Sequence, residues 1–575
     1  MALQARYRWR LPDGTAPDPG LLSAARERGL GERLARVLAA RGHRSPADLA
    51  AFFDAAEAGL NDPALLPDAV TVLERIGHAR SAGERLLVFG DFDADGVTGL
   101  AVLVRALRRL GLDAAPYVPS RLSEGHGLSL AAVERARAEG RSLIVTVDCG
   151  TTSVAEVTAA RAAGIDVIVT DHHHVPERLP DAVAVVNPHR PGSRYPDARL
   201  AGSGVAFTLA RLLLPGMPDA AGMVPDLAAL AVIGTVADVA PMVGENRAIA
   251  RIGLERLRSA PPAGIAALLV GAGLRSDRID LDSIAYAIAP RLNAGGRMGD
   301  ATTAADLLLT DDPAAAERLA GELEIANLAR RELTRSVLDE ARRSVEAQPG
   351  AGATIVAGEW PVGIIGLVAG RLAEERGRPA VVLSSAHDPW RASARSAGGF
   401  DLAAAFEACG DLFARHGGHP QAAGGDLPAA LFEPFRERFL ALAGAAPLDP
   451  RPELGVDVVL TAHDLGYGLL RELAALEPTG PGNPAPLVGV SGLSVTRVRP
   501  AGEGHAQLTL RKGREVLDGI AFERVDLVER LREGDAVEVV ARLASRTFGG
   551  YESLQLELRD VAAPGPLAAW LETAA

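Results

Sequence analysis

Short aliphatic runs alternate with longer amphipathic stretches between residues 81 and 311. The runs are Arg85–Phe89, Leu143–Val147, Val167–Thr170 and Val183–Val186. The stretches between them with helical periodicity are Leu100–Leu110, Leu130–Glu139 and Val154–Ala163. Strand, helix and strand at this spacing are typical of a parallel sheet with right-handed crossovers. We therefore expect an α/β domain over residues 81–311.

The pattern on either side of this region predicts further domains. Residues 1–80 have the periodicity of helices, at Leu21–Ala40, Pro46–Ala58 and Asp68–Ser81. Residues 312–350 are long, charged and periodic, which predicts a connector helix. Residues 351–446 predict a second, smaller α/β domain with strands at Thr354–Ala357 and Ala380–Leu383. A linker rich in proline follows.

Residues 453–563 alternate apolar runs with turns that contain glycine. The six runs are Gly455–Leu460, Leu487–Val498, Ala506–Arg511, Glu515–Ala521, Ala536–Arg542 and Ser553–Leu558. They predict a small antiparallel barrel of the OB type, or a sandwich of similar size. Residues 564–575 remain as a C-terminal tail. The expected fold is α/β, with a parallel-sheet domain joined by a long helix to a smaller α/β domain and then to a β-barrel.

Acidic residues and histidines follow three of the predicted strands at the point where each strand ends. They are Asp91, Asp93 and Asp95 after the first run, Asp148 after the second, and Asp171, His172 and His173 after the third. Asp238 follows another apolar stretch, Leu227–Ala237. Because ligands bind outside the carboxyl ends of parallel strands, we expect these side chains to meet at one edge. Clustered carboxylates repel one another, and mixed Asp/His ligands suit Mn²⁺ or Mg²⁺.

Two such cations bound close together are typical of enzymes that act on phosphoryl groups. Ions about 3.5–4 Å apart activate water and neutralise the charge that develops on a phosphoryl group. The cluster therefore predicts metal-assisted hydrolysis of a phosphate ester or anhydride. Spacing alone leaves pyrophosphate, a dinucleotide and a polynucleotide open as substrates.

Composition narrows the protein class. The chain has 575 residues, two cysteines and a formal net charge of −13. Two cysteines exclude a disulfide framework and a four-thiolate metal site. The acidic balance argues against coating nucleic acid through bulk charge, and it leaves room for a local basic channel. The apolar runs are too short for a signal peptide or a membrane span, so we expect a cytoplasmic protein without membrane contacts.

Four motifs in order resemble the DHH phosphoesterase superfamily. They are GDFDADGVTG at 90–99, VTVDCG at 145–150, DHH at 171–173 and GTVADV at 234–239. Four more resemble its single-strand-specific exonucleases: APRLNAGGR at 289–297, SARS at 393–396, GGHPQAAG at 417–424 and LEPTGPGNP at 476–484. The resemblance covers most of the chain from residue 84 to the barrel. It implies a DHH domain, a DHHA1 domain and an OB fold.

The resemblance also implies roles for the clustered residues. Asp93 would bind one Mn²⁺ or Mg²⁺ ion, and Asp148 would bridge two ions. The implied ligands of the second ion are Asp95, His172 and Asp238. Asp91 would orient either ion through water. His173 would face the scissile phosphate as electrostatic stabiliser or proton donor, with Asp171 fixing the neighbouring imidazole.

One position departs from the family pattern. Many relatives have a histidine four residues before the first ligand aspartate, where this chain has Phe89. We therefore expect the first ion to be held less firmly and completed by water or substrate.

Substrate contacts are expected in all three domains. The candidates in the DHH domain are Arg109, Arg121, Arg291, Asn293 and Arg297. Asn293 would contact the substrate or cap a turn. The candidates in the DHHA1 domain for a terminal 5′ phosphate are Ser393, Arg395, Gly418 and His419. In the barrel, Arg497, Phe548 and Tyr551 offer the charge and stacking rings with which OB folds bind single strands.

The resemblance implies a 5′→3′ exonuclease that hydrolyses single-stranded DNA to nucleoside 5′-monophosphates in recombination and repair. Its expected partners are a strand with a 5′ end, a helicase and a single-strand-binding protein. One alternative is a phosphodiesterase acting on oligoribonucleotides or cyclic dinucleotides, which usually lacks such a barrel. Another is a non-catalytic strand-binding scaffold, against which the intact acidic and histidine set argues.

Overall fold

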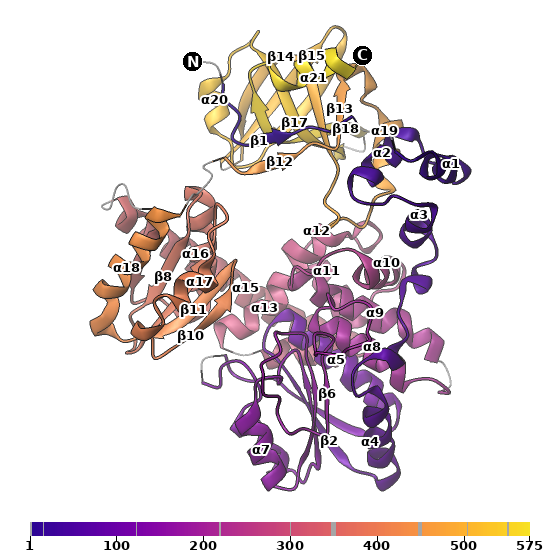
Figure 1. Ribbon diagram of the computed structural model, residues 1–575, viewed down its shortest axis with the longest axis vertical. Coiled ribbons are helices and arrows are strands. Elements are labelled where there is room, and N and C mark those ends of the chain that lie inside the picture. Colours follow the sequence, from indigo (N-terminus) through magenta and orange to yellow (C-terminus); the bar gives the residue numbers. More distant parts are fainter. Residues whose placement is uncertain are drawn as a thin grey trace. The chain divides into compact units, whose positions relative to one another are not determined.

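The computed structural model describes residues 3–14, 17–121, 123–217, 220–299, 301–346, 352–446, 451–502, 504–548 and 551–574. The chain forms two compact units, one of residues 55–448 and one of residues 1–54 with 449–575 (Figure 1). The first eighty residues, expected as one helical region, are thus shared between the two units. Within the described ranges, no helix combines the length and the hydropathy that crossing a bilayer requires.

A five-stranded parallel sheet forms the centre of the first α/β domain. Its order is β3 (Asp113–Tyr117), β2 (Arg85–Gly90), β4 (Leu143–Val147), β5 (Asp166–Thr170) and β6 (Ala184–Val186). Four of these strands match the predicted aliphatic runs. The pattern missed β3 because its sequence, DAAPY, has no β-branched run. Its proline is tolerated because β3 lies at the sheet edge.

Successive side chains of these strands point to opposite faces, and each face is covered by helices. Leu86 and Val88 of β2 join the core that includes α5 (Ala94–Arg109), α8 (Gly202–Leu213) and α9 (Ala220–Ala237). Leu87 and Phe89 join the opposite core with α6 (Leu130–Ala138) and α7 (Val154–Ala162). Burial on both faces explains why these strands are continuously apolar.

Further helices complete the domain. They are α4 (Ala69–Ala82), α10 (Gly244–Ser259), α11 (Ala263–Gly271), α12 (Leu281–Ser283), α13 (Ala289–Met298) and α14 (Thr302–Leu309). The connector helix is α15 (Pro313–Glu346), 34 residues long. Its N-terminal part joins the core of the first domain through Leu323, and its C-terminal part joins the core of the second through Val337.

The second α/β domain has a mixed sheet with the order β10, β11, β9, β8 and β7. The predicted strands are β7 (Thr354–Gly358) and β8 (Ala380–Ser384), which pair in parallel. The others, β9 (Trp390–Arg395), β10 (Arg415–His419) and β11 (Ala422–Leu427), are antiparallel. They escaped prediction because small and charged residues replace an aliphatic run. The helices are α16 (Val362–Arg376), α17 (Leu402–Glu407) and α18 (Phe432–Ala445).

The other unit is built on a closed barrel. Its strands are β14 (Leu487–Ala501), β15 (His505–Lys512), β16 (Glu515–Ala521), β18 (Tyr551–Ala562) and β17 (Ala536–Phe548), in ring order. Pairing of β17 with β14 closes the ring, which decides for a barrel over a sandwich. The remaining elements of the C-terminal segment are β12 (Glu453–Gly455), β13 (Val458–Thr461), α19 (Tyr467–Ala474), α20 (Asp526–Arg530) and α21 (Pro566–Ala574).

The N-terminal segment belongs to the barrel unit. It contains β1 (Arg8–Arg10), α1 (Pro19–Glu27), α2 (Glu32–Ala40) and α3 (Pro46–Phe53). The buried carboxylate of Asp560 accepts hydrogen bonds from the backbone of Arg6 and Tyr7 and from the Trp9 indole. The single helix expected over 21–40 is two helices, because Gly29 takes a positive φ of 73° after α1.

Candidate active site

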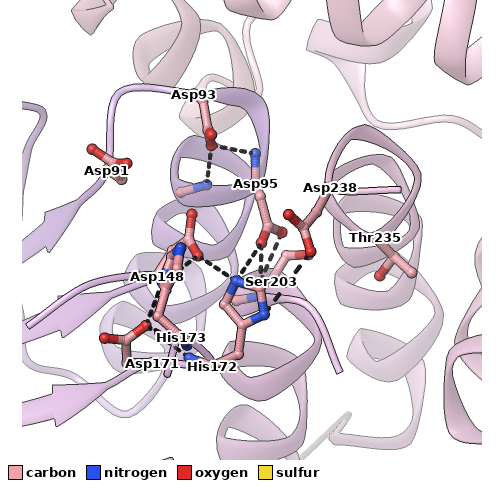
Figure 2. Close-up of polar contacts among 12 residues, drawn as sticks. Asp91, Asp93, Asp95, Asp148, Asp171, His172, His173, Ser203, Thr235 and Asp238 are labelled. Carbon is pink, nitrogen blue, oxygen red and sulfur yellow. Dashed lines mark hydrogen bonds and ion pairs between the residues drawn. The ribbon is translucent and has the colours of Figure 1, made fainter. Parts of the chain in front are cut away.

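The carboxyl ends of β2, β4 and β5 lie next to one another at one edge of the parallel sheet. The loops that follow them carry the clustered acids and histidines, and Asp238 arrives from the C-terminal end of α9 (Figure 2). The structure brings together Asp91, Asp93, Asp95, Asp148, His172, His173 and Asp238. This edge is the candidate active site.

The ligand atoms form three overlapping groups, within each of which they lie within 4.8 Å of one another. The groups are Asp91 with Asp93 and Asp148, Asp95 with His172 and Asp238, and Asp148 with His172 and His173. The second group is the set that the resemblance implies for one ion. Asp148 belongs to both of the other groups, a position suited to a shared ligand.

Local backbone geometry aims these carboxylates. Asp93 is the N-cap of α5, and its Oδ1 accepts hydrogen bonds from the backbone of Asp95 at 3.0 Å and Gly96 at 3.1 Å. Asp148 has a positive φ of 61°, a strained conformation for a residue with a side chain. Gly202 packs against this turn, where a Cβ atom would come within 2.5 Å of the Asp148 Cβ.

Sequence reasoning missed the backbone cradle that holds Asp95. The amides of Gly202 and Ser203, at the start of α8, donate to its carboxylate at 2.7 and 3.0 Å. These two hydrogen bonds fix the orientation of the Asp95 carboxylate at the N-terminus of α8. Gly234 on α9 lies against the same carboxylate, and a Cβ there would overlap Asp95 Oδ1 and Ser203 Oγ. The only signal in the sequence was the GSG triplet at 202–204.

The cluster carries a high electrostatic cost without a cation. Burial, with Asp91 and Asp95 nearby, raises the pKa of Asp93 to about 6. Burial and the neighbouring aspartates raise the pKa of Asp148 well above its usual range. Burial, with Asp95 and Asp93 nearby, raises the pKa of Asp238 to about 8. A divalent cation bound here would reverse these shifts by removing the repulsion.

Polar atoms without partners show that the site fits such a cation. Asp91 Oδ1, Asp148 Oδ1 and His172 Nε2 are buried and make no hydrogen bond. His172 Nε2 and Asp148 Oδ1 lie 3.0 Å apart without hydrogen-bond geometry, as two ligands of one ion do. Carboxylate oxygens with one imidazole nitrogen form a donor set suited to Mn²⁺ or Mg²⁺.

His173 differs from His172 in its charge state. Its Nδ1 lies 2.8 Å from Asp171 Oδ1, and this contact raises the pKa of His173 to about 9. The same Asp171 oxygen accepts from the backbone amides of His172 and His173, and the other oxygen accepts from Thr151. His173 is therefore positively charged at neutral pH, and its side chain is about half exposed.

Phe89 stands four residues before Asp93, at the position where the family pattern predicts a histidine. Phe89 is fully buried and stacks on Tyr117 at 5.5 Å. A different histidine, His126, places its Nδ1 3.1 Å from Asp91 Oδ2 and its ring 4.5 Å from that of Phe92. His126 was not among the predicted residues, because nothing in GHG at 125–127 marked it as a candidate.

Three of the predicted arginines lie within electrostatic reach of one another. Burial lowers the pKa values of Arg121, Arg297 and Arg395, and Arg121 lowers those of Arg297 and Arg395 further; all three stay charged at neutral pH. The negative charge of Asp93 raises the pKa values of both Arg121 and Arg297, so these arginines lie within electrostatic reach of the clustered carboxylates. Arg395 Nη1 donates to Ser393 Oγ at 3.4 Å, so the two side chains of the SARS motif lie next to each other.

Three other predicted residues of the DHH domain lie on helices α5 and α13. Arg109 ends α5, so sixteen residues of helix, about 22 Å, separate it from the cluster at the other end. Arg291 is engaged with Glu324 at 2.5 Å and with the carbonyl of Ala287. Asn293 Oδ1 accepts a hydrogen bond from the Ala94 amide at 2.8 Å, at the first residue of α5.

The remaining predicted residues lie on strands. Gly418 and His419 are exposed on β10, and His419 and Arg395 both pair with Ala422 of β11 from opposite sides. About 10 Å, two strand spacings, therefore separates them. Arg497 is exposed on β14 of the barrel. The backbones of Phe548 and Tyr551 pair at the end of the β17–β18 hairpin, and their side chains lie outside the described part of the chain.

Comparisons with known protein families match the three predicted domains in order along the chain. Residues 85–235 match the DHH family N-terminal domain, residues 350–445 the DHHA1 domain, and residues 456–560 the RecJ OB domain. The single-stranded-DNA-specific exonuclease RecJ of Bacillus subtilis (strain 168) is 34% identical over 569 residues, covering 97% of this chain and 71% of that protein.

Solved structures give the same result. The crystal structure of RecJ in complex with Mn²⁺ from Thermus thermophilus superposes with a TM-score of 0.82 at 32% identity, covering 98% of this chain and 80% of that one. The Mg²⁺ complex from the same organism gives 0.76 at 31% identity, covering 98% and 79%. On its sequence, its three domains and its fold, the chain belongs to the RecJ family of the DHH phosphoesterase superfamily.

Proposed function

We propose that this RecJ-family exonuclease degrades single-stranded DNA from a 5′ end and releases nucleoside 5′-monophosphates, in DNA recombination and repair. The observation that carries the proposal is a cluster of carboxylates and histidines with buried unpartnered ligand atoms, within electrostatic reach of desolvated arginines. Such an arrangement suits a substrate that is negatively charged along its length.

Two Mn²⁺ or Mg²⁺ ions bound here would supply Lewis acidity and lower the pKa of a coordinated water. The chain's ligands for one ion would be Asp93 and Asp148, with Asp91 close by. The other would take Asp95, Asp148, His172 and Asp238. The Gly202–Ser203 cradle and the Asp93 cap fix two of these carboxylates before substrate binds.

Charged side chains around the ions complete the proposed site. His173 holds a proton on Nε2 because Nδ1 is engaged by Asp171, so it would stabilise the negative charge that builds up on the scissile phosphate. Arg121, Arg297 and Arg395 would bind phosphates of the strand, and Ser393 would share a terminal 5′ phosphate with Arg395. The barrel, with Arg497 on its surface, would hold a more distant part of the strand.

Timed digestion of end-labelled strands tests the proposal. With Mn²⁺, a 5′ label is expected in mononucleotides from the earliest time points, while a 3′ label stays in shortening strands. A 5′ phosphate is expected to accelerate digestion, and a blunt duplex to resist it. Early release of the 3′ label would contradict the proposed polarity, and cleavage confined to dinucleotides or cyclic dinucleotides would favour a small-substrate phosphodiesterase.

A DNA substrate would place the protein in the cytoplasm, beside a helicase and a single-strand-binding protein that expose and present the 5′ end. This expectation is tested by a pull-down with the full chain as bait, with and without single-stranded DNA, in which a helicase or a single-strand-binding protein should be recovered.

A further inference from the structure

One arginine on the connector helix has an unusual environment. Leu323 of α15 belongs to the core of the first α/β domain, and Val337 belongs to the core of the second. Arg330 lies seven residues from each, so all three share one face of the helix. Arg330 therefore lies on the inner face of α15, between the segments that join the two cores.

The Arg330 guanidinium has no acidic partner among the described residues. Its Nη2 donates to the neutral Asn327 side chain at 2.8 Å, and its Nε is buried without any hydrogen bond. Two other arginines near it have carboxylate partners: Arg291 binds Glu324, and Arg335 binds Glu332 at 2.8 Å. A partly buried cation without an anion is costly, so a free protein gains nothing in stability from this side chain.

The charges that do surround Arg330 are positive. Burial, with Arg331 and Arg291 nearby, lowers its pKa. Arg330 in turn lowers the pKa of Arg297, as Arg121 and Arg395 also do. Asp93 raises the pKa values of Arg297 and Arg121. Through Arg297, Arg330 thus joins Arg121 and Arg395 in one positive group.

We propose that Arg330 binds a backbone phosphate of the single strand, one that lies beyond the phosphate held at the metal centre. The proposal rests on the proposed function, which supplies the polyanion. It extends the substrate-binding set from the two domains to the helix that joins them. A phosphate would satisfy the unpartnered Nε through charge-assisted hydrogen bonds and relieve the repulsion within the positive group.

The test compares Arg330→Met with Arg335→Gln in the full chain. Arg335 is a matched control because it lies on the same helix with 71% of its side chain exposed. Binding of a 5′-phosphorylated fluorescent single strand is measured by anisotropy in EDTA across a range of NaCl concentrations. For Arg330→Met we expect about tenfold weaker binding, as for loss of one charge-assisted bond. The slope of log K against log [NaCl] is expected to fall by about 0.7.

Thermal unfolding of the DNA-free variants separates binding from structure. Removing an unpaired cation should leave the melting temperature of Arg330→Met unchanged or higher than that of the wild type, while Arg335→Gln keeps the wild-type salt slope. A wild-type salt slope in Arg330→Met, or a lowered melting temperature with unchanged binding, would overturn the proposal. Absence of strand binding by the wild type would instead refute the proposed function.

Discussion

Replacing Asp93 by asparagine should stabilise the metal-free protein while destroying its response to metal. Asp93 combines two roles, as N-cap of α5 and as a member of the acidic cluster. Asparagine keeps the cap, because its side-chain oxygen still accepts from the first amides of the helix. It removes one negative charge from a site where Asp91 and Asp95 repel it.

The magnitude follows from the shifted pKa. The folded protein raises the pKa of Asp93 from 3.8 to about 6, so the folded state holds this proton more tightly than the unfolded state does. The stability of the wild type therefore falls as the pH rises from about 4 to about 6, and the loss is complete above that. A shift of this size corresponds to about 3 kcal/mol as an upper limit.

Urea unfolding in EDTA measures this difference. At pH 8 the Asp93→Asn variant should be more stable than the wild type by up to about 3 kcal/mol, and at pH 5 the advantage should shrink to about half. Added Mn²⁺ should stabilise the wild type much more than the variant. A variant that is no more stable than the wild type at pH 8, or whose advantage is the same at both pH values, would refute the reasoning.

Three further changes test other parts of the site. Asp148→Ala should abolish Mn²⁺-dependent digestion of a 5′-labelled single strand and leave binding in EDTA largely intact; undiminished cleavage would exclude it as the shared ligand. Gly234→Ala should displace Asp95 and raise the Mn²⁺ concentration needed for half-maximal rate by at least about tenfold, with an unchanged metal response speaking against the packing argument. His173→Gln should lower kcat about 10²–10³-fold while bound Mn²⁺, counted by equilibrium dialysis, stays the same; a loss of bound metal would assign His173 to the ligands instead.

The sequence predicted the acidic edge because its signal is local. All the ligands except Asp238 follow a buried strand by one to five residues, and parallel strands place their carboxyl ends at the same edge. Asp238 instead follows helix α9. The Gly202–Ser203 cradle lacks such a signal, since it depends on where α8 docks against Asp95. The same holds for His126, which reaches Asp91 from a loop after β3.

Substrate contacts assigned from charge alone stay predictions, because the position of each side chain depends on tertiary structure. Arg109 was a candidate for its charge, and α5 places it at the opposite end of that helix from the cluster. Arg291 lies in a recognised motif, but a carboxylate on α15 already engages it. Arg330 attracted no attention in a helix rich in charge, because only the packing of both cores against α15 reveals that its face is the inner one.

Crystals of the protein grown or soaked with Mn²⁺, and measured for anomalous scattering near the manganese edge, test the central claim most directly. We expect two peaks at the carboxyl edge of the parallel sheet, one bounded by Asp91, Asp93 and Asp148 and the other by Asp95, His172 and Asp238. Saturating Mn²⁺ with no peak at this edge, or ions bound only elsewhere on the protein, would contradict the account.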